Sequence, residues 1–445
     1  MLNFLAKAKP DRWHHAPRRH SLAEVYASVS VPKASSWFRR LLAVTGPGYL
    51  IAVGYMDPGN WATDIAGGSK YAYALLSAVL LSNFIAIFLQ ALSSKLGLAT
   101  GRDLAQACRD TYSRPVSHVL WVTAQLAIVA CDIAEVIGAA IALKLLFHLP
   151  LVAGVLLTSL DVLVILSLQH RGFRWIEALV TGLILVMMGC FAALLSYSKP
   201  DWGQVAHGFL PSAQIVRDPA MLYIALGILG ATVMPHNLYL HSSIVLTRER
   251  TTTAAELKDR VRLAITDSTI ALMLALFVNA AILILAAATF YRSGNYGVND
   301  IQQAYHMLTP LVGTALAAPL FAIALLASGQ NSTLTGTLAG QVILEGFSDL
   351  KVKPWVQRLV SRSLAIIPAA FAVVLYGEGG LARLLIFSQV ILSLQLPFAV
   401  FPLAQITSDH HKMGEMVNRP WVKTLAYTLA AIIAGLNLYL VATSL

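Results

Sequence analysis

Apolar segments of about 20 residues recur along the whole chain of 445 residues. A helix of that length crosses the hydrocarbon core of a bilayer. Hydrophobic residues make up 57% of the chain and charged residues only 12%, and the mean hydropathy is +0.68. This balance is too apolar for a soluble protein of such length. We therefore expect an all-α polytopic membrane protein.

The basic residues predict how the chain crosses the membrane. Residues 1–40 hold eight Lys and Arg and lack the apolar core of a signal peptide, so we interpret them as a basic cytoplasmic tail that contacts anionic lipid head groups. We expect eleven spans, which place the C-terminus outside. With this topology only six of the 32 Lys and Arg lie in outer segments, as the positive-inside rule requires: Lys70, Lys144, Lys199, Arg217, Arg292 and Arg383.

A polar sequence interrupts the first span. Residues 55–60 read Tyr-Met-Asp-Pro-Gly-Asn, in the middle of the apolar segment from about 41 to 68. Proline removes a backbone donor and glycine weakens a helix, so we expect two half-helices joined by unwound backbone near Asp57. An ionised aspartate at bilayer depth costs roughly 2.5 to 3.5 kcal/mol, so Asp57 is expected to line a cavity and meet a cation.

The sixth span holds a second interruption, residues 231–237, which read Ala-Thr-Val-Met-Pro-His-Asn. Five spans run from the first broken helix to the second, and a duplicated unit with an odd number of spans inserts in the opposite orientation. We therefore expect an inverted repeat of residues 41–199 and 220–408, with an eleventh span at 420–445. A proline kink without function is the alternative for either interruption.

Side chains at the two interruptions suit a transition-metal ion. Asp57 offers a carboxylate oxygen, Asn60 an amide oxygen and Met234 a thioether, and the backbone near Gly54 and Ala231 can supply carbonyl groups. Mg²⁺ and Ca²⁺ prefer shells made only of oxygen, whereas a thioether suits Mn²⁺, Fe²⁺, Co²⁺ or Cd²⁺. As alternatives, Met234 could be a packing residue and Asn60 could cap the second half-helix.

The sequences DPGN at 57–60 and MPH at 234–236 are marks of the Nramp family of proton-coupled divalent metal transporters. The chain closely resembles this family from about Gly46 onward, with further matches at 329–333 (GQNST) and 388–397 (SQVILSLQLP). The resemblance implies a LeuT-like fold with discontinuous first and sixth helices. It also implies a set of metal ligands: Asp57, Asn60, Met234, the carbonyls of Ala231 and Gly54, and in some conformations Gln389.

Two positions relate the chain to branches of this family. Gly54 stands where many members have alanine, which implies more backbone freedom at a carbonyl ligand. Relatives that carry Mg²⁺ lack the methionine, so Met234 places the chain with the bacterial manganese and iron transporters.

Acidic residues of the third span are candidates for a proton path. Asp132 and Glu135 are three residues apart and so lie on one helical face. Protonation can neutralise such acids inside a membrane, and His236 titrates near neutral pH when unperturbed. A salt bridge to Arg362 is the structural alternative. The resemblance implies that these four residues act together with Asp57.

The expected function is secondary active import of Mn²⁺ or Fe²⁺, and also Cd²⁺ or Co²⁺, coupled to protons by alternating access. The metal is the substrate, and no prosthetic cofactor is expected. An organic-cation or amino-acid symporter of the same fold is an alternative, with Asp57 as the counter-ion of an ammonium group, but it leaves Met234 without a role. A metal-gated channel or sensor is a third possibility.

Other features exclude several classes of protein. The sequence has no P-loop, nucleophile elbow or HExxH motif, so no enzyme is expected. Topology explains the net charge of +10, so the expected partners are metal ions, protons and lipids, not nucleic acid, and we expect a monomer. Cys108, Cys131 and Cys190 are too widely spaced for a disulfide framework and are expected to be packing residues. Compact loops without a usable glycosylation sequon favour a bacterial inner membrane.

Overall fold

The computed structural model describes residues 13, 20–31, 36–160, 172–249, 253–348 and 354–444, apart from a few side chains, most of them between 354 and 379. The helices of the first half are α1 (Trp37–Val44), α2 (Pro47–Gly54), α3 (Pro58–Tyr71), α4 (Leu76–Thr100), α5 (Leu104–Thr111), α6 (Arg114–Phe147), α7 (Leu151–Leu157) and α9 (Phe173–Ser198).

The second half is equally helical. Its helices are α10 (Trp202–Gly208), α11 (Gln214–Arg217), α12 (Pro219–Thr232), α13 (Pro235–Ile244), α14 (Ala254–Ala286), α15 (Ile301–Val312), α16 (Ala317–Ser348), α17 (Pro354–Thr407), α18 (His410–Met413) and α19 (Pro420–Ser444). The β-structure found within the described ranges is an isolated parallel bridge between Val29 and Arg248.

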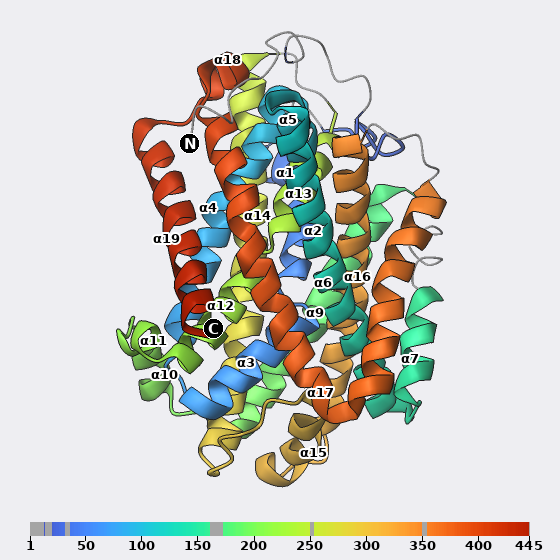
Figure 1. Ribbon diagram of the computed structural model, residues 1–445, viewed down its shortest axis with the longest axis vertical. Helices are drawn as coiled ribbons and strands as arrows, with labels where there is room; N and C mark the ends of the chain where they lie inside the picture. The colour runs from blue at the N-terminus through green and yellow to red at the C-terminus, as the bar shows by residue number, and fades with distance from the viewer. Residues whose placement is uncertain are drawn as a thin grey trace.

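Long helices run along the long axis of the molecule and surround the two broken pairs, α2–α3 and α12–α13 (Figure 1). α14 packs against α2, α3 and α4, while α6 packs against α16 and α17. α19 lies at the periphery against α17. The buried apolar side chains of these helices form one large core, in which the interruptions are the polar exceptions.

Seven helical stretches of the described residues are long and apolar enough to cross a membrane, and they correspond to seven of the expected spans. The other four expected spans correspond to the broken α2–α3 pair, to α7 with the segment after it, to α16 and to the first part of α17. Residues 161–171, which follow α7, lie outside the described ranges. The number of eleven spans therefore stays a prediction.

The ninth and tenth expected spans belong to one helix, α17, of 54 residues. At 1.5 Å per residue, a straight helix of that length would be far longer than a bilayer is thick. Figure 1 shows that α17 turns back on itself and forms two arms. Each arm can therefore act as a span of its own.

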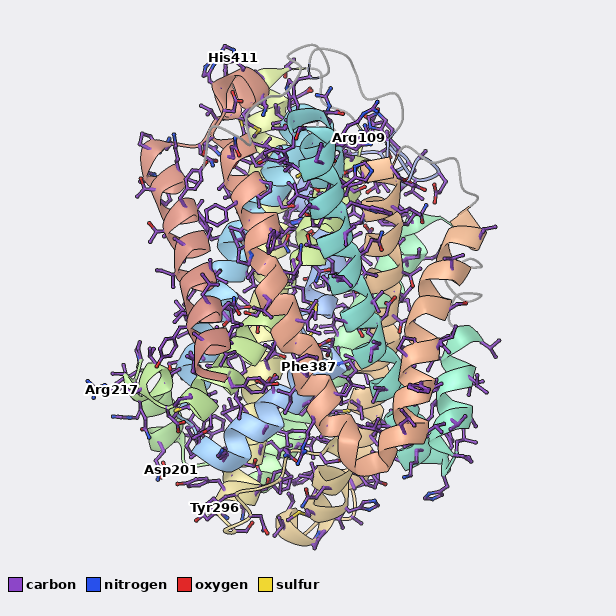
Figure 2. All side chains as sticks on the ribbon, viewed as in Figure 1. Arg109, Asp201, Arg217, Tyr296, Phe387 and His411 are labelled. Atoms are coloured by element: carbon purple, nitrogen blue, oxygen red, sulfur yellow. The ribbon has the colours of Figure 1, made fainter. Side chains whose placement is uncertain are left out.

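Polar residues mark the two ends of the molecule. Arg109 and His411 lie at one end, and Asp201, Arg217 and Tyr296 lie at the opposite end (Figure 2). The expected topology assigns these two groups to opposite sides of the membrane, and their positions agree with it. The molecule is thus an integral membrane protein whose helices run from one polar end to the other.

Residues 20–31, which we call the N-terminal strap, dock onto helix ends before the first span. Leu22 is buried, and its backbone N–H donates to Glu345 Oε2 of α16 at 2.9 Å. The hydroxyl of Ser21 donates to Asp103 Oδ2, just before α5, at 2.6 Å. This part of the tail contacts protein, because its apolar side chains find a buried surface there. The expected contact of the basic tail with lipid head groups stays a prediction.

Asp103 is the buried acceptor of the strap and also the N-cap of α5. Its Oδ1 accepts from the backbone N–H of Gln106 at 2.9 Å. Burial raises the pKa of Asp103 from 3.8 to about 6, although the hydrogen bonds from Ser21 and Gln106 oppose the shift. Because the pKa is higher in the folded state, the folded protein holds this proton more tightly. Protonated Asp103 therefore contributes to the free energy of unfolding. This contribution is complete below about pH 4 and is lost as the pH rises through 6.

We expect Asp103→Asn to weaken this pH dependence, because asparagine caps helices about as well as aspartate and stays neutral. Between about pH 5 and pH 7.5, the unfolding free energy of the wild type should fall relative to that of the variant by on the order of 1 kcal/mol. Thermal unfolding in detergent measures the difference. Asp201→Asn is the control, since Asp201 caps α10 at an exposed position. Parallel pH curves for wild type and Asp103→Asn would contradict the prediction.

Candidate metal site

The first broken helix unwinds at residues 55–57, between α2 and α3, where the proline and glycine predict it. Unwinding frees carbonyl groups that a continuous helix would have paired. The carbonyl of Tyr55 accepts from Asn279 Nδ2 of α14 at 2.7 Å, and that of Met56 accepts from Ser328 Oγ of α16 at 2.5 Å. Two neighbouring helices therefore stabilise the unwound backbone.

The second break separates α12 from α13 at Val233 and Met234. Pro235 occupies the first turn of α13, where its missing N–H costs nothing. α12 packs against α3, and α13 packs against α2. The two interruptions, 177 positions apart in the sequence, therefore face each other in the middle of the bundle.

Three predicted site residues meet between these breaks. Asp57 is the N-cap of α3, and its Oδ1 accepts from the backbone N–H of Asn60 at 2.7 Å and from Asn60 Nδ2 at 2.9 Å. Asn60 Nδ2 also donates to the carbonyl of Ala231 at 3.1 Å. All three residues are fully buried. The alternative role of Asn60 as the helix cap is wrong, because Asp57 occupies that position.

Two oxygens of this cluster, Asp57 Oδ2 and Asn60 Oδ1, have no hydrogen-bond partner in the described part of the chain. A buried polar atom without a partner costs about 1 to 3 kcal/mol, and more when it is charged. A bound cation would accept lone pairs from both oxygens and remove that cost. The cluster thus has the electrostatic character of a cation site.

Met234 is fully buried beside the cluster. It packs against Ala127 and Cys131 of α6 and Leu392 of α17, and its Sδ lies 3.8 Å from Asn237 Nδ2. The packing role that we weighed for this methionine is therefore present, and its role as a ligand stays a prediction.

Gln389 and Gly54 each lie against a residue of the broken helices. Gln389 of α17 lies over Gly59, so closely that a Cβ on this glycine would overlap the amide nitrogen Nε2. Gln389 Oε1 has no hydrogen-bond partner within the described ranges. A Cβ on Gly54 would likewise overlap the side-chain amide of Asn237. Glycine at position 54 therefore makes room for Asn237, a steric reason that the sequence did not suggest.

The two acids of α6 share a face, as their spacing predicts. Both point toward Gly336 of α16, where a Cβ would lie 2.9 Å from Glu135 Oε1 and 3.0 Å from Asp132 Oδ1. Both residues are buried. The side chain of Arg362 lies outside the described residues, so the alternative of a salt bridge between it and these acids is not tested.

His236 connects to these acids through a residue that we expected only to pack. Cys131 Sγ lies 3.7 Å from His236 Nε2 and 3.4 Å from Glu135 Oε1. His236, Cys131 and Glu135 therefore form a continuous line of polar contacts from α13 to α6.

Sequence reasoning missed several buried polar residues near the site. Asp64, seven residues after Asp57 in α3, is fully buried, and neither of its carboxylate oxygens has a hydrogen-bond partner among the described residues. The rule that selected Asp57, an acid inside an apolar span, would have found it. Gln90 donates to Tyr55 Oη at 2.6 Å and contacts His241 Nδ1 at 2.9 Å.

A pocket of about 860 Å³ opens at the end of the molecule where Tyr296 lies (Figure 2). It is lined by residues of α3, α12 and α17, among them Ala66, Tyr223 and Arg383. Asp57 has no exposed surface, so the cluster is closed off from this pocket. The pocket shares α3 with the cluster and is a candidate for an access route along it.

Comparisons with known proteins agree with this architecture. Residues 48–443 match the Nramp family, natural resistance-associated macrophage protein-like. The chain is similar to the divalent metal cation transporter MntH of Listeria innocua, with 56% identity over 440 residues and 98% of each chain covered.

Solved structures give the same assignment. The chain is similar to the manganese transporter of Eremococcus coleocola, with a TM-score of 0.87, 42% identity, and 94% of this chain and 90% of that chain covered. Mhp1, a nucleobase-cation-symport-1 family transporter, matches at a TM-score of 0.60 and 16% identity over 89% of this chain and 90% of that one, which confirms the LeuT-like fold. The chain belongs to the Nramp family.

Proposed function

We propose that this protein imports divalent transition-metal ions, Mn²⁺ and Fe²⁺ and also Cd²⁺ and Co²⁺, into the cytoplasm. The main support is a pair of buried oxygens, Asp57 Oδ2 and Asn60 Oδ1, at the point where the two broken helices meet. Neither oxygen has a hydrogen-bond partner among the described residues. The ion would be bound by Asp57, Asn60, the Ala231 carbonyl and the Met234 thioether. The relatives named above, a divalent metal cation transporter and a manganese transporter, support the proposal.

Alternating access would move the metal through this site. Residues 41–199 and 220–408 would rock as inverted repeats around it, and the carbonyl of Gly54 and the amide of Gln389 would join the ligands in some conformations. The start of α2 is tied to α14, because Asp267 Oδ2 accepts from the backbone N–H of Gly48 at 2.8 Å. An opening that moved the start of α2 away from α14 would break this contact.

Protons would be coupled to the metal through the polar line between α13 and α6. Asp57 would release its proton when metal binds, and His236, Asp132, Glu135 and Arg362 would form the path that leads it away. The contacts of Cys131 with His236 and Glu135 support a continuous route between the two helices.

Uptake into proteoliposomes tests the function directly. Under an inward proton gradient and a negative-inside potential, Mn²⁺ is expected to enter and the lumen to acidify in parallel. Mn²⁺ entry without acidification would reject the coupling and keep metal transport. Absence of Mn²⁺ flux would reject the proposed function and leave an amine carrier as the alternative.

Met234→Ala is expected to relax the discrimination between Mn²⁺ and Ca²⁺, because removal of the thioether leaves a shell made of oxygen. We expect inhibition of Mn²⁺ uptake by Ca²⁺ to strengthen roughly tenfold, or about 1.4 kcal/mol of lost selectivity. Met273→Ala, at an exposed position of α14, is the control. Unchanged Ca²⁺ competition in Met234→Ala would show that the sulfur does not select the ion.

The setting of the transporter is part of the proposal. We propose a bacterial inner membrane, a cytoplasmic N-terminal tail formed by residues 1–40, an eleventh span at 420–445 and a C-terminus outside. The protein would act as a monomer in contact with membrane lipids and would not be an enzyme.

A further inference from the structure

Cys131 is surrounded by side chains of the kinds that bind metal ions. Its Sγ lies 3.4 Å from Glu135 Oε1 and 3.7 Å from His236 Nε2, and its side chain packs against Met234. The thiol is 1% exposed. The remaining ring nitrogen of His236, Nδ1, is buried and has no hydrogen-bond partner in the described ranges. The thiol thus faces a cluster that has unused ligand capacity.

This thiol belongs to the candidate metal site and not to a separate one. No group of three His, Cys, Asp or Glu side chains in the described residues is arranged to bind a metal alone. Met234, a proposed ligand at that site, packs directly against Cys131. A cation held by Asp57 and Met234 would therefore lie near a second sulfur atom.

We propose that Cys131 is a specificity-determining residue that makes the site bind thiophilic divalent cations, Cd²⁺ above all, more tightly than Mn²⁺. The proposal rests on the proposed function and adds a ligand to it. Thiolate sulfur strongly favours soft cations, whereas Mn²⁺ gains little from it over oxygen and nitrogen ligands. The metal binds the thiolate form, so each bound Cd²⁺ releases the thiol proton to solvent.

Titration of the purified full-length protein with Cd²⁺ tests the ligation without transport. Thiolate-to-cadmium charge transfer absorbs in the ultraviolet, and we expect this absorption in the wild type and in Cys190→Ala. It should be absent in Cys131→Ala and in the conservative Cys131→Ser. Cys190, buried in the core at α9, is a matched control for loss of a buried thiol.

The Cys131 variants could lose the absorption because they fail to fold. A protein in which Cys131 is the only cysteine avoids this problem, because Cys131 itself is kept. The double variant Cys108→Ala/Cys190→Ala is expected to keep the full absorption, and its loss there would overturn the proposal. Persistence of the absorption in Cys131→Ser or Cys131→Ala would overturn it equally.

Transport gives the second readout. In Cys131→Ala, the ratio of the inhibition constant of Cd²⁺ to the KM for Mn²⁺ should rise roughly tenfold, whatever the variant does to the overall rate of uptake. A purely packing role predicts instead that both cations are affected equally, which would overturn the proposal. If the wild type does not transport Mn²⁺, the proposed function fails, and the absorption still decides whether Cys131 binds Cd²⁺.

Discussion

Asp57→Asn is expected to lower Mn²⁺ affinity roughly a hundredfold, or about 2.7 kcal/mol, and to abolish detectable uptake. Asp57 is the only carboxylate among the proposed metal ligands, so its replacement removes the single negative charge that they offer the ion. Asparagine has nearly the same shape and can still accept the hydrogen bond from the backbone N–H of Asn60, which caps α3. The loss should therefore appear in binding and not in the fold.

Binding of Mn²⁺ to the purified protein and uptake into proteoliposomes measure the two losses. Asp64→Asn is the matched control, because Asp64 lies in the same helix and is equally buried. It stands seven residues from Asp57, about 10 Å along the helix axis, and so is too far away to share the ion. The site would have to be reassigned if Asp57→Asn bound Mn²⁺ as tightly as the wild type, or if Asp64→Asn lost binding to the same extent.

Local backbone chemistry made both helix breaks predictable. Proline cannot donate to the preceding turn, and Pro58 and Pro235 each stand in the first turn of a new helix. The membrane class followed from composition, and the LeuT-like fold from a resemblance carried by the two broken segments. These features depend on residues that are close together in the sequence.

Contacts between helices were much less predictable. The sequence does not say which face of α14 or α16 turns inward, so Asn279 and Ser328 gave no sign that they pair with the unwound carbonyls. Cys131 was assigned to packing because a lone thiol in an apolar span has no local signal of its neighbours. The N-terminal strap was interpreted only as part of the basic tail, since the charge of the tail is evident in the sequence and the docking surface of the strap is not.

A buried ion pair anchors the entry to α2 and gives the second large effect. Glu177 of α9 accepts from Arg248 Nη1 at 2.6 Å and from Arg174 Nη1 at 3.1 Å. The side chains of Glu177 and Arg248 are only 5% and 3% exposed. Both arginines also donate to the carbonyl of Thr45, at 2.7 Å from Arg248 and 2.5 Å from Arg174. The pair therefore fixes the backbone directly before α2, the first half of the first broken helix.

Glu177→Gln is expected to lower the unfolding free energy by about 3 to 5 kcal/mol, because it leaves the charge of Arg248 buried without its counter-ion. Chemical unfolding in detergent measures this loss. Asp259→Asn is the control: it breaks the ion pair with Arg40, whose side chains are 29% and 34% exposed, and should cost less than about 1 kcal/mol. Adding Arg248→Met to Glu177→Gln should restore part of the stability, since the buried charge of the arginine is then removed together with its counter-ion. Equal losses in Glu177→Gln and Asp259→Asn would mean that the buried pair does not hold α2 in place.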